Sequence, residues 1–188
     1  TSEFSAAVSA GKTDLILEAG EYVFDKKISV VKDMRLTGNG DVKVKGYVAI
    51  DGDDLGKLVF DNIHFVCDGT NGNAFNVAAA SSANSVTVKN CIFDGYTKSV
   101  WYDNNGLTTQ SILLSNNRVV NHGTGQGVFD IRKGACTSLT IEHCTITGGR
   151  DLIRADANTI TGAFTFRNNT VDGSNLGVNA KGIMYVRA

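Results

Sequence analysis

Short runs in which apolar and polar residues alternate recur along the chain at a nearly constant spacing. Each run leads to a polar pivot, an apolar residue follows three positions later, and a glycine comes soon after it. Five segments share this pattern: LVFDNIHFVCDG (58–69), VTVKNCIFDG (86–95), ILLSNNRVVNHG (112–123), LTIEHCTITGG (139–149) and FTFRNNTVDG (164–173). Alternation with a period of two predicts β-strands, and the Gly, Asn and Asp residues predict the turns between them.

The pivots repeat every 25–28 residues and are Asn62, Asn90, Asn116, His143 and Asn168. A second family of strand-like segments lies in the same periods, at 47–50, 74–77, 99–102, 128–131, 152–154 and 183–186. Each period therefore holds at least two short strands. A propeller blade needs roughly 40–50 residues, and a leucine-rich repeat would need many more than the 11 leucines present. The pattern predicts one all-β domain over residues 1–188, a single-stranded right-handed parallel β-helix of about 6–7 coils.

Stacked coils place equivalent residues about 4.8 Å apart, so pivot asparagines can form an amide ladder. Asparagine also tolerates the left-handed backbone of a bend, and we expect His143 to replace it as a polar rung. The cysteines do not fit disulfides, because Cys91 and Cys144 share a coil position but lie two coils, roughly 9.6 Å, apart. All four cysteines are predicted to be free thiols that fill apolar space.

The two ends of the chain differ. Residues 2–10 (SEFSAAVSA) form a short amphipathic stretch that Gly11 can close, which predicts a helical cap over residues 1–11. The other end, GIMYVRA, stops on a strand without a polar cap, although terminal repeats usually need one. We therefore expect a fragment of a longer polypeptide, with end-to-end association or a further domain at the C-terminal coil.

Composition agrees with stacked coils. The chain has no proline, 21 glycines, 17 asparagines, and 31 Val and Ile residues. No apolar run approaches 18 residues, which predicts no membrane insertion. A net charge of −1 does not indicate a nucleic-acid partner. The charge is uneven, however, because residues 1–94 carry 9 basic and 13 acidic side chains while residues 95–188 carry 9 and 6.

The opening helix, the segment LILEAGEYVF and coils that contain NCIFDG or NNTVDG resemble the pectin-lyase-like right-handed β-helix superfamily. Within it, the chain resembles surface β-helix domains of Bacteroidetes of uncharacterised function and is distantly similar to the chondroitinase-B and alginate-lyase group. The resemblance covers essentially the whole chain. It implies the fold, a location outside the cell or at its surface, and a polysaccharide partner; such coils host many activities.

Arginines recur at the ends of the second strand family: Arg132, Arg154 and Arg187, with Arg150 and Lys133 nearby. They predict a basic stripe that binds the carboxylates of an acidic glycan, because guanidinium groups pair with carboxylates in a bidentate manner. The alternative is that each arginine pairs with a neighbouring carboxylate, such as Asp130, Asp151 or Asp156.

A uronate lyase must neutralise the substrate carboxylate and remove the proton beside it. The resemblance to the chondroitinase-B and alginate-lyase group implies Lys133 as the base and Arg154 as its assistant. The calcium ligands of that group are not matched, since Asp130 is the only acidic residue on the strand before Lys133. We therefore expect no cofactor and no metal, with calcium as the alternative.

Asp130 and three further residues are candidate substrate contacts. His122 lies in NHGTGQG, which resembles the Gly-His-Gly turn of the galacturonases, but the aspartate pair of those hydrolases is missing. Trp101 and Tyr102 are neighbours on one strand, so one should face the core and the other solvent. An exposed aromatic ring there would stack on a sugar.

The function expected from these observations is recognition of a polysaccharide, with acidic glycans as the candidate class and catalysis not established. A uronate lyase and a structural spacer in a surface protein are the two alternatives.

Overall fold

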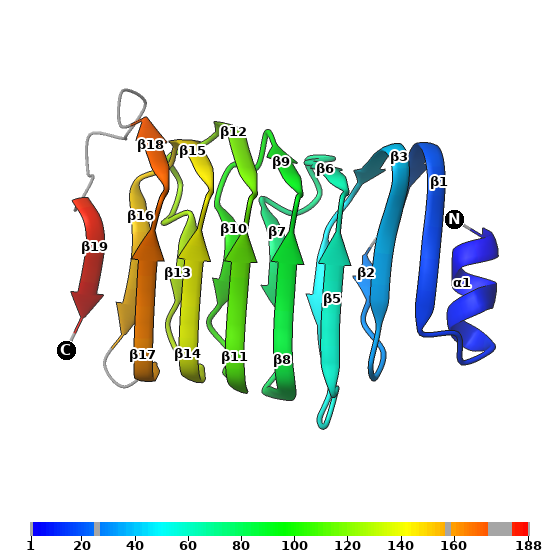
Figure 1. Cartoon of the computed structure of the whole chain (residues 1–188), viewed down its shortest axis with the longest axis horizontal. Coiled ribbons are helices and arrows are strands. Elements are labelled where there is room, and N and C mark those ends of the chain that lie inside the picture. Colours follow the sequence, from blue (N-terminus) through cyan, green and yellow to red (C-terminus); the bar gives the residue numbers. More distant parts are fainter. Residues whose placement is uncertain (1, 25–26, 157–158, 173–181, 188) are drawn as a thin grey trace.

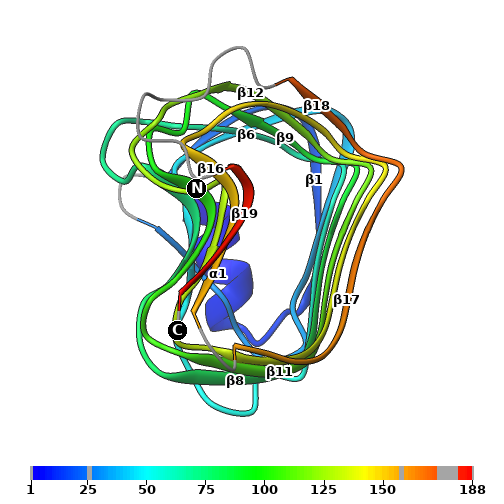
Figure 2. The ribbon, with the colours of Figure 1, turned by 90° about the vertical axis from the view of Figure 1, so that its left-hand side faces the viewer.

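The computed structural model describes residues 2–24, 27–156, 159–172 and 182–187, the last segment as backbone only. They form an all-β right-handed parallel β-helix of about six turns that begins with one short helix, as the sequence predicts (Figure 1). Viewed along the stack, the coils superimpose on one another (Figure 2). All strand pairs in this part of the chain are parallel between neighbouring coils, so each coil is bonded to the next along its whole outline.

The strands build three faces. Face 1 holds the first halves of β1 (Asp14–Val23) and β3 (Arg35–Lys45), whose second halves lie on face 2, and the strands that run up to the pivots: β5 (Lys57–Asp61), β8 (Ser81–Lys89), β11 (Leu107–Ser115), β14 (Ala135–Glu142) and β17 (Ile160–Arg167). Face 2 holds the strands that follow the pivots: the second half of β3, β6 (His64–Val66), β9 (Ile92–Asp94), β12 (Arg118–His122), β15 (Thr145–Gly148) and β18 (Thr170–Asp172). The long strand β3 joins the two faces into one sheet.

Face 3 is a separate sheet made of the second predicted strand family. Its strands are β2 (Ile28–Ser29), β4 (Val48–Ile50), β7 (Asn73–Val77), β10 (Ser99–Asp103), β13 (Phe129–Ile131), β16 (Asp151–Asp156) and β19 (Gly182–Arg187). A typical coil thus has three strands where the sequence showed two families, because each pivot divides one repeat segment into a face 1 strand and a face 2 strand.

The pivots form the corner between faces 1 and 2. All five have a left-handed backbone with φ between 53° and 56°, as expected for asparagine at a bend: Asn62, Asn90, Asn116, His143 and Asn168. The predicted amide ladder is present between Asn116 Nδ2 and Asn90 Oδ1, at 2.8 Å. Two other pivots bond to different acceptors on the preceding coil: Asn90 donates to Asp61 Oδ1, and Asn62 donates to the carbonyl of Gly38.

A second asparagine row lies one residue further along and points inward. The Oδ1 of Asn117, which is 4% exposed, accepts the Cys91 N–H at 2.9 Å, and its Nδ2 donates to the Val88 carbonyl at 2.8 Å. Asn169 bonds to Cys144 and Ile141 in the same way, at 2.8 and 2.9 Å. Each of these amides thus fastens its own coil to the preceding one at the corner.

The four cysteines are free thiols, as predicted. Burial raises the pKa of Cys91 to about 12 and also raises the pKa of Cys136 and of Cys144. The Cys91 thiol donates to the Lys89 carbonyl at 3.1 Å, and the Cys144 thiol to that of Glu142 at 3.3 Å. These thiols stay protonated at neutral pH, so they act as apolar packing groups and not as nucleophiles.

The interior is apolar and is closed at one end by the predicted helix, α1 (Ser2–Ser9). Phe4 of α1 packs edge-on against Phe24, with ring centroids 5.0 Å apart. Gly11 follows with a φ of 72°, which ends the helix as expected. Figure 2 shows α1 lying across the end of the stack, within the outline of the coils.

Candidate functional site

Several of the predicted contact residues lie side by side on face 3. Backbone register places Tyr102 opposite Asp130 and Asp130 opposite Arg154, so the three form a row across β10, β13 and β16. Trp101 points the other way and is 1% exposed. The alternation of the strand is therefore as predicted, but Trp101 belongs to the core and does not reach a ligand on this face.

The arginines on this face are paired with carboxylates. Arg132 donates from Nε and Nη2 to the two carboxylate oxygens of Asp130, at 2.7 and 2.6 Å, and its guanidinium lies 5.2 Å from the Tyr102 ring centroid. The hydrogen bond to Asp130 raises the pKa of Arg132. Asp130 itself is 0% exposed. This ion pair is therefore a structural feature of face 3, and the two Arg132 donors that could bind a ligand carboxylate side by side already bond to Asp130.

Arg150 and Arg154 also face carboxylates, since Arg150 Nε donates to Asp151 at 2.9 Å and Arg154 Nε lies 3.9 Å from Asp156 Oδ1. The three arginines of the row whose side chains the structure describes thus lie beside carboxylates, as the alternative interpretation expects. Arg187 lies in β19, where its backbone pairs with Asp156. Its side chain lies outside the described part of the chain.

Lys133 and His122 are not part of the row. Lys133 is exposed in the turn after β13, three residues beyond Asp130, the residue opposite Arg154. His122 ends β12, before the chain enters β13, and is 6% exposed. None of the three cavities described below is lined by Lys133, Arg154, Asp130 or His122. None of these three cavities therefore brings the proposed base and its assistant together.

The environment of His122 makes protein stability depend on pH. Its Nδ1 donates to the Gly123 carbonyl at 2.6 Å, and its buried Nε2 has no hydrogen-bond partner among the described residues. Burial lowers the pKa of His122 from the ordinary value of 6.5. The folded protein thus takes up this proton less readily than the unfolded chain, and each unit of difference amounts to about 1.4 kcal/mol.

We expect the stability that neutral His122 contributes to be complete above pH 6.5 and to be lost as the pH falls below it. The urea midpoint should therefore fall less between pH 8 and pH 5.5 in His122→Leu than in the parent protein. His143→Asn, which introduces the usual pivot residue at an exposed position, should keep the parent pH dependence. An unchanged slope in His122→Leu would contradict the assignment.

A shallow groove of about 430 Å³ lies on face 2, on the outward side of the strands that follow the pivots. We call it the face 2 groove. It is lined by His64, Ile92, Asp94, Arg118, Val120, Asn121 and Thr147. Backbone register aligns His64, Ile92 and Arg118 in one row and Asp94 and Val120 in a second row, and Thr147 follows on β15, where the register against β12 shifts. Both rows are perpendicular to the strands and follow the axis of the stack.

The polar groups of the groove are positioned by one another. Asn121 donates to Asp94 Oδ1 at 2.8 Å, and the other oxygen, Oδ2, lies 3.5 Å from Nε2 of His64. Asn121 has a left-handed backbone with a φ of 52°, and this bend brings its amide to Asp94 on the preceding coil. Arg118 is exposed and makes no ion pair with any described residue. Ile92 and Val120 provide an apolar floor between these groups.

The groove continues across the corner between faces 1 and 2. A smaller cavity of about 80 Å³ shares His64 and Ile92 with it and extends to Asn62, Asn90 and the 40–42 segment of β3. Together the two cavities cross β3, β6, β9, β12 and β15. Four strand spacings correspond to about 19 Å, so the groove is long enough for several units of an extended polymer.

Sequence reasoning missed the face 2 groove. A signal was present, because His64, Ile92 and Arg118 each lie two residues after a pivot, and Asp94 and Val120 each lie four residues after one. Such residues share the outward side of face 2. Among the described residues no group of three or more His, Cys, Asp or Glu side chains could hold a metal ion, and no helix is long and apolar enough to span a bilayer.

One comparison with known proteins gives a match. The model of a family described as "Domain of unknown function (DUF4957)" matches residues 20–149, which is more than half of the chain and includes every strand that builds the groove. Searches of curated proteins and of solved structures find no match.

Proposed function

Because the chain belongs to the DUF4957 family, a domain of unknown function, we propose a function from its own surface. The domain binds an extended polysaccharide chain in the face 2 groove, at the cell surface or outside the cell. The observation that carries the proposal is the set of exposed and half-buried polar groups along an apolar floor across five neighbouring strands.

The form of the groove favours a polymer over a compact small molecule. It is open and shallow, and it runs along the stack axis, whereas sites for small ligands are usually enclosed clefts. Hydroxyl-rich chains need polar groups at regular intervals and apolar surface for the faces of the sugar rings. His64, Asp94 and Arg118 can supply the hydrogen bonds, and Ile92 and Val120 can supply the apolar contact.

The contrast with face 3 supports the same choice. There the guanidinium of Arg132 is occupied by Asp130, whereas Arg118 has no ion-pair partner among the described residues. A carboxylate or sulfate on the polymer would give Arg118 a charge-assisted hydrogen bond. Acidic glycans are therefore the class to test first, together with neutral glucans.

Removing the groove's polar groups should weaken glycan binding. We expect Arg118→Ala to reduce affinity about 10-fold or more, because a hydrogen bond to a charged group is worth about 1.5–3 kcal/mol. Affinity gel electrophoresis against alginate, pectate, glycosaminoglycans and neutral glucans, followed by titration calorimetry, measures the change. Arg35→Ala is the matched control, since Arg35 is an exposed arginine on face 1. If every polymer that retards the parent protein retards Arg118→Ala equally, the face 2 groove is not the binding site.

The uronate lyase expected as an alternative has no support from the placement of Lys133 and Arg154. The same polymers can be monitored for the absorbance of the unsaturated product. A rise that Lys133→Ala abolishes and Arg118→Ala leaves intact would replace binding by β-elimination on face 3.

A structural spacer is the second candidate function, and the arginine pairs favour it. Arg132, Arg150 and Arg154 lie against carboxylates, as in a surface built for stability. Under this candidate none of the polymers binds, and Arg118→Ala changes neither binding nor stability.

A further inference from the structure

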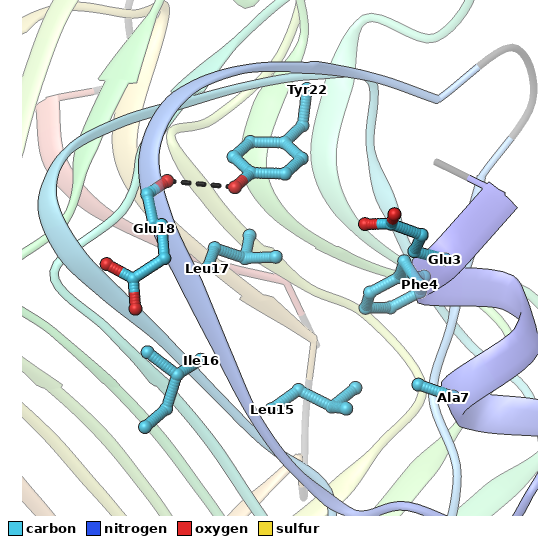
Figure 3. Close-up of a pocket in the computed structure, with 8 residues that line it drawn as sticks. All are labelled: Glu3, Phe4, Ala7, Leu15, Ile16, Leu17, Glu18 and Tyr22. Carbon is cyan, nitrogen blue, oxygen red and sulfur yellow. Dashed lines mark hydrogen bonds between the residues drawn. The ribbon is translucent and has the colours of Figure 1, made fainter.

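The N-terminal end of the stack has a cavity of about 390 Å³ between α1 and β1 (Figure 3). Phe4 of α1 and Leu15, Leu17 and Tyr22 of β1 provide its apolar lining. Glu3 and Glu18 are the charged groups that line it, and both are acidic. Figure 3 shows the two carboxylates on opposite sides of this lining, one on the helix and one on the strand.

The cavity lies beside an open strand edge. Among the described strands β1 pairs only with β3, and the Thr13 carbonyl accepts the Arg35 N–H at 2.6 Å. The N–H and C=O groups of successive residues on a strand point to alternate sides. Leu15 and Leu17 therefore face β3 with Thr13, and the backbone groups of Asp14, Ile16 and Glu18 face away from it.

The open edge is short because β1 itself blocks it beyond Glu18. The register of β1 against β3 shifts between Glu18 and Gly20, which marks a β-bulge. The hydroxyl of Tyr22 then donates to the Glu18 carbonyl at 2.9 Å, as the dashed line in Figure 3 shows. The stretch that can accept another strand thus runs from Asp14 to the N–H of Glu18, or roughly 15 Å of extended chain.

This edge carries an apolar side chain that folded proteins normally cover. Ile16 is 65% exposed, although exposed apolar edge strands favour pairing with other chains. The edge also carries negative charge. Glu21 is paired with Lys45 at 2.7 Å, but Glu3 makes no ion pair with a described residue, and Glu18 is held by the amide of Asn39 at 2.8 Å.

The acidic side chains beside this edge indicate which kind of strand can pair with it. A second copy that paired its β1 with this one would bring acidic side chains of both strands together, and like charges across a strand pair are destabilising. A strand with lysine or arginine beside apolar residues would instead match both the carboxylates and the apolar lining. We propose that β1 receives an extended basic peptide segment of a partner protein, which adds a strand to the sheet between Asp14 and Glu18.

The test uses the whole chain and two immobilised decapeptide libraries of alternating pattern. Both have Val, Ile, Leu or Phe at every second position, and the positions between are Lys or Arg in one library and Asp or Glu in the other. The basic library should yield binders, and hydrogen exchange at the amides of Ile16 and Glu18 should slow at least 10-fold when such a peptide is bound. Binding to the acidic library alone, or no protection of these amides, would overturn the proposal.

Two variants test whether the selected peptides bind at the edge of β1. Ile16→Pro removes an outward N–H at an edge position that tolerates proline and should weaken the selected peptides at least 10-fold. Glu18→Lys should shift selection to the acidic library, whereas Asp53→Lys, the same charge change at an exposed residue near face 3, should not. A concentration-dependent dimer in sedimentation that Ile16→Pro disrupts would show that a second copy is the occupant and would refute the peptide.

Discussion

Asn117→Ala should lower the free energy of unfolding by about 2–6 kcal/mol, although it removes only one small polar side chain. The amide satisfies the N–H of Cys91 and the carbonyl of Val88 in the preceding coil, and the site is 4% exposed. Its loss leaves two buried backbone groups without partners, each of which costs about 1–3 kcal/mol. Water cannot easily replace the amide, because the apolar core surrounds this corner.

Urea unfolding followed by fluorescence measures this change, since Trp101 is the only tryptophan and is buried. Asn84→Ala is the control, because Asn84 is exposed on β8 and should change stability by no more than about 0.5 kcal/mol. Similar losses in the two variants would mean that the Asn117 amide does not connect the coils.

Arg132→Ala should cost about 3–5 kcal/mol at pH 7, because it leaves the carboxylate of Asp130 buried without its bidentate partner. The double variant Asp130→Asn with Arg132→Ala should be more stable at pH 7 than Arg132→Ala alone, because it removes the uncompensated charge. An equal loss in the single and the double variant would show that Arg132 acts through packing alone.

The coils and their corners could be predicted because they depend on local chemistry. Each pivot needs a residue that accepts a left-handed backbone, and Asn62, Asn90, Asn116 and Asn168 signal that requirement in the sequence itself. His143 takes the same backbone without being an asparagine, and the repeat length identified it. The third strand of each coil was less visible, because its boundary is the pivot and not a glycine.

The arginine row could be predicted only in part from the sequence. Arg132 lies two residues after Asp130, and residues two apart on a strand share a side, so their pairing was one of two interpretations that the sequence allowed. Choosing between the interpretations required the side-chain geometry. Three of the nine basic residues in the second half of the chain, Arg132, Arg150 and Arg154, thus lie beside carboxylates at face 3.

The face 2 groove could not be derived in the same way. His64 and Asp94 come from adjacent coils and differ by two residues along the strand, so their contact depends on the register of β6 against β9. The inward position of Asn117 is similar, because the adjacent Asn116 has the same residue type and points outward to the ladder. In both cases the deciding quantity is how one coil is aligned with the next.

The uniform corner also determines how this architecture can change in length. Every pivot turns the chain through the same left-handed backbone, and the described strands pair only with strands of adjacent coils. A duplicated or deleted coil that begins and ends at a pivot therefore keeps the strand pairing of the remaining coils. The reach of the groove then changes in steps of one strand spacing, about 4.8 Å. Homologues with one coil more or fewer would differ in the length of polymer they contact, while the chemistry of each step stays the same.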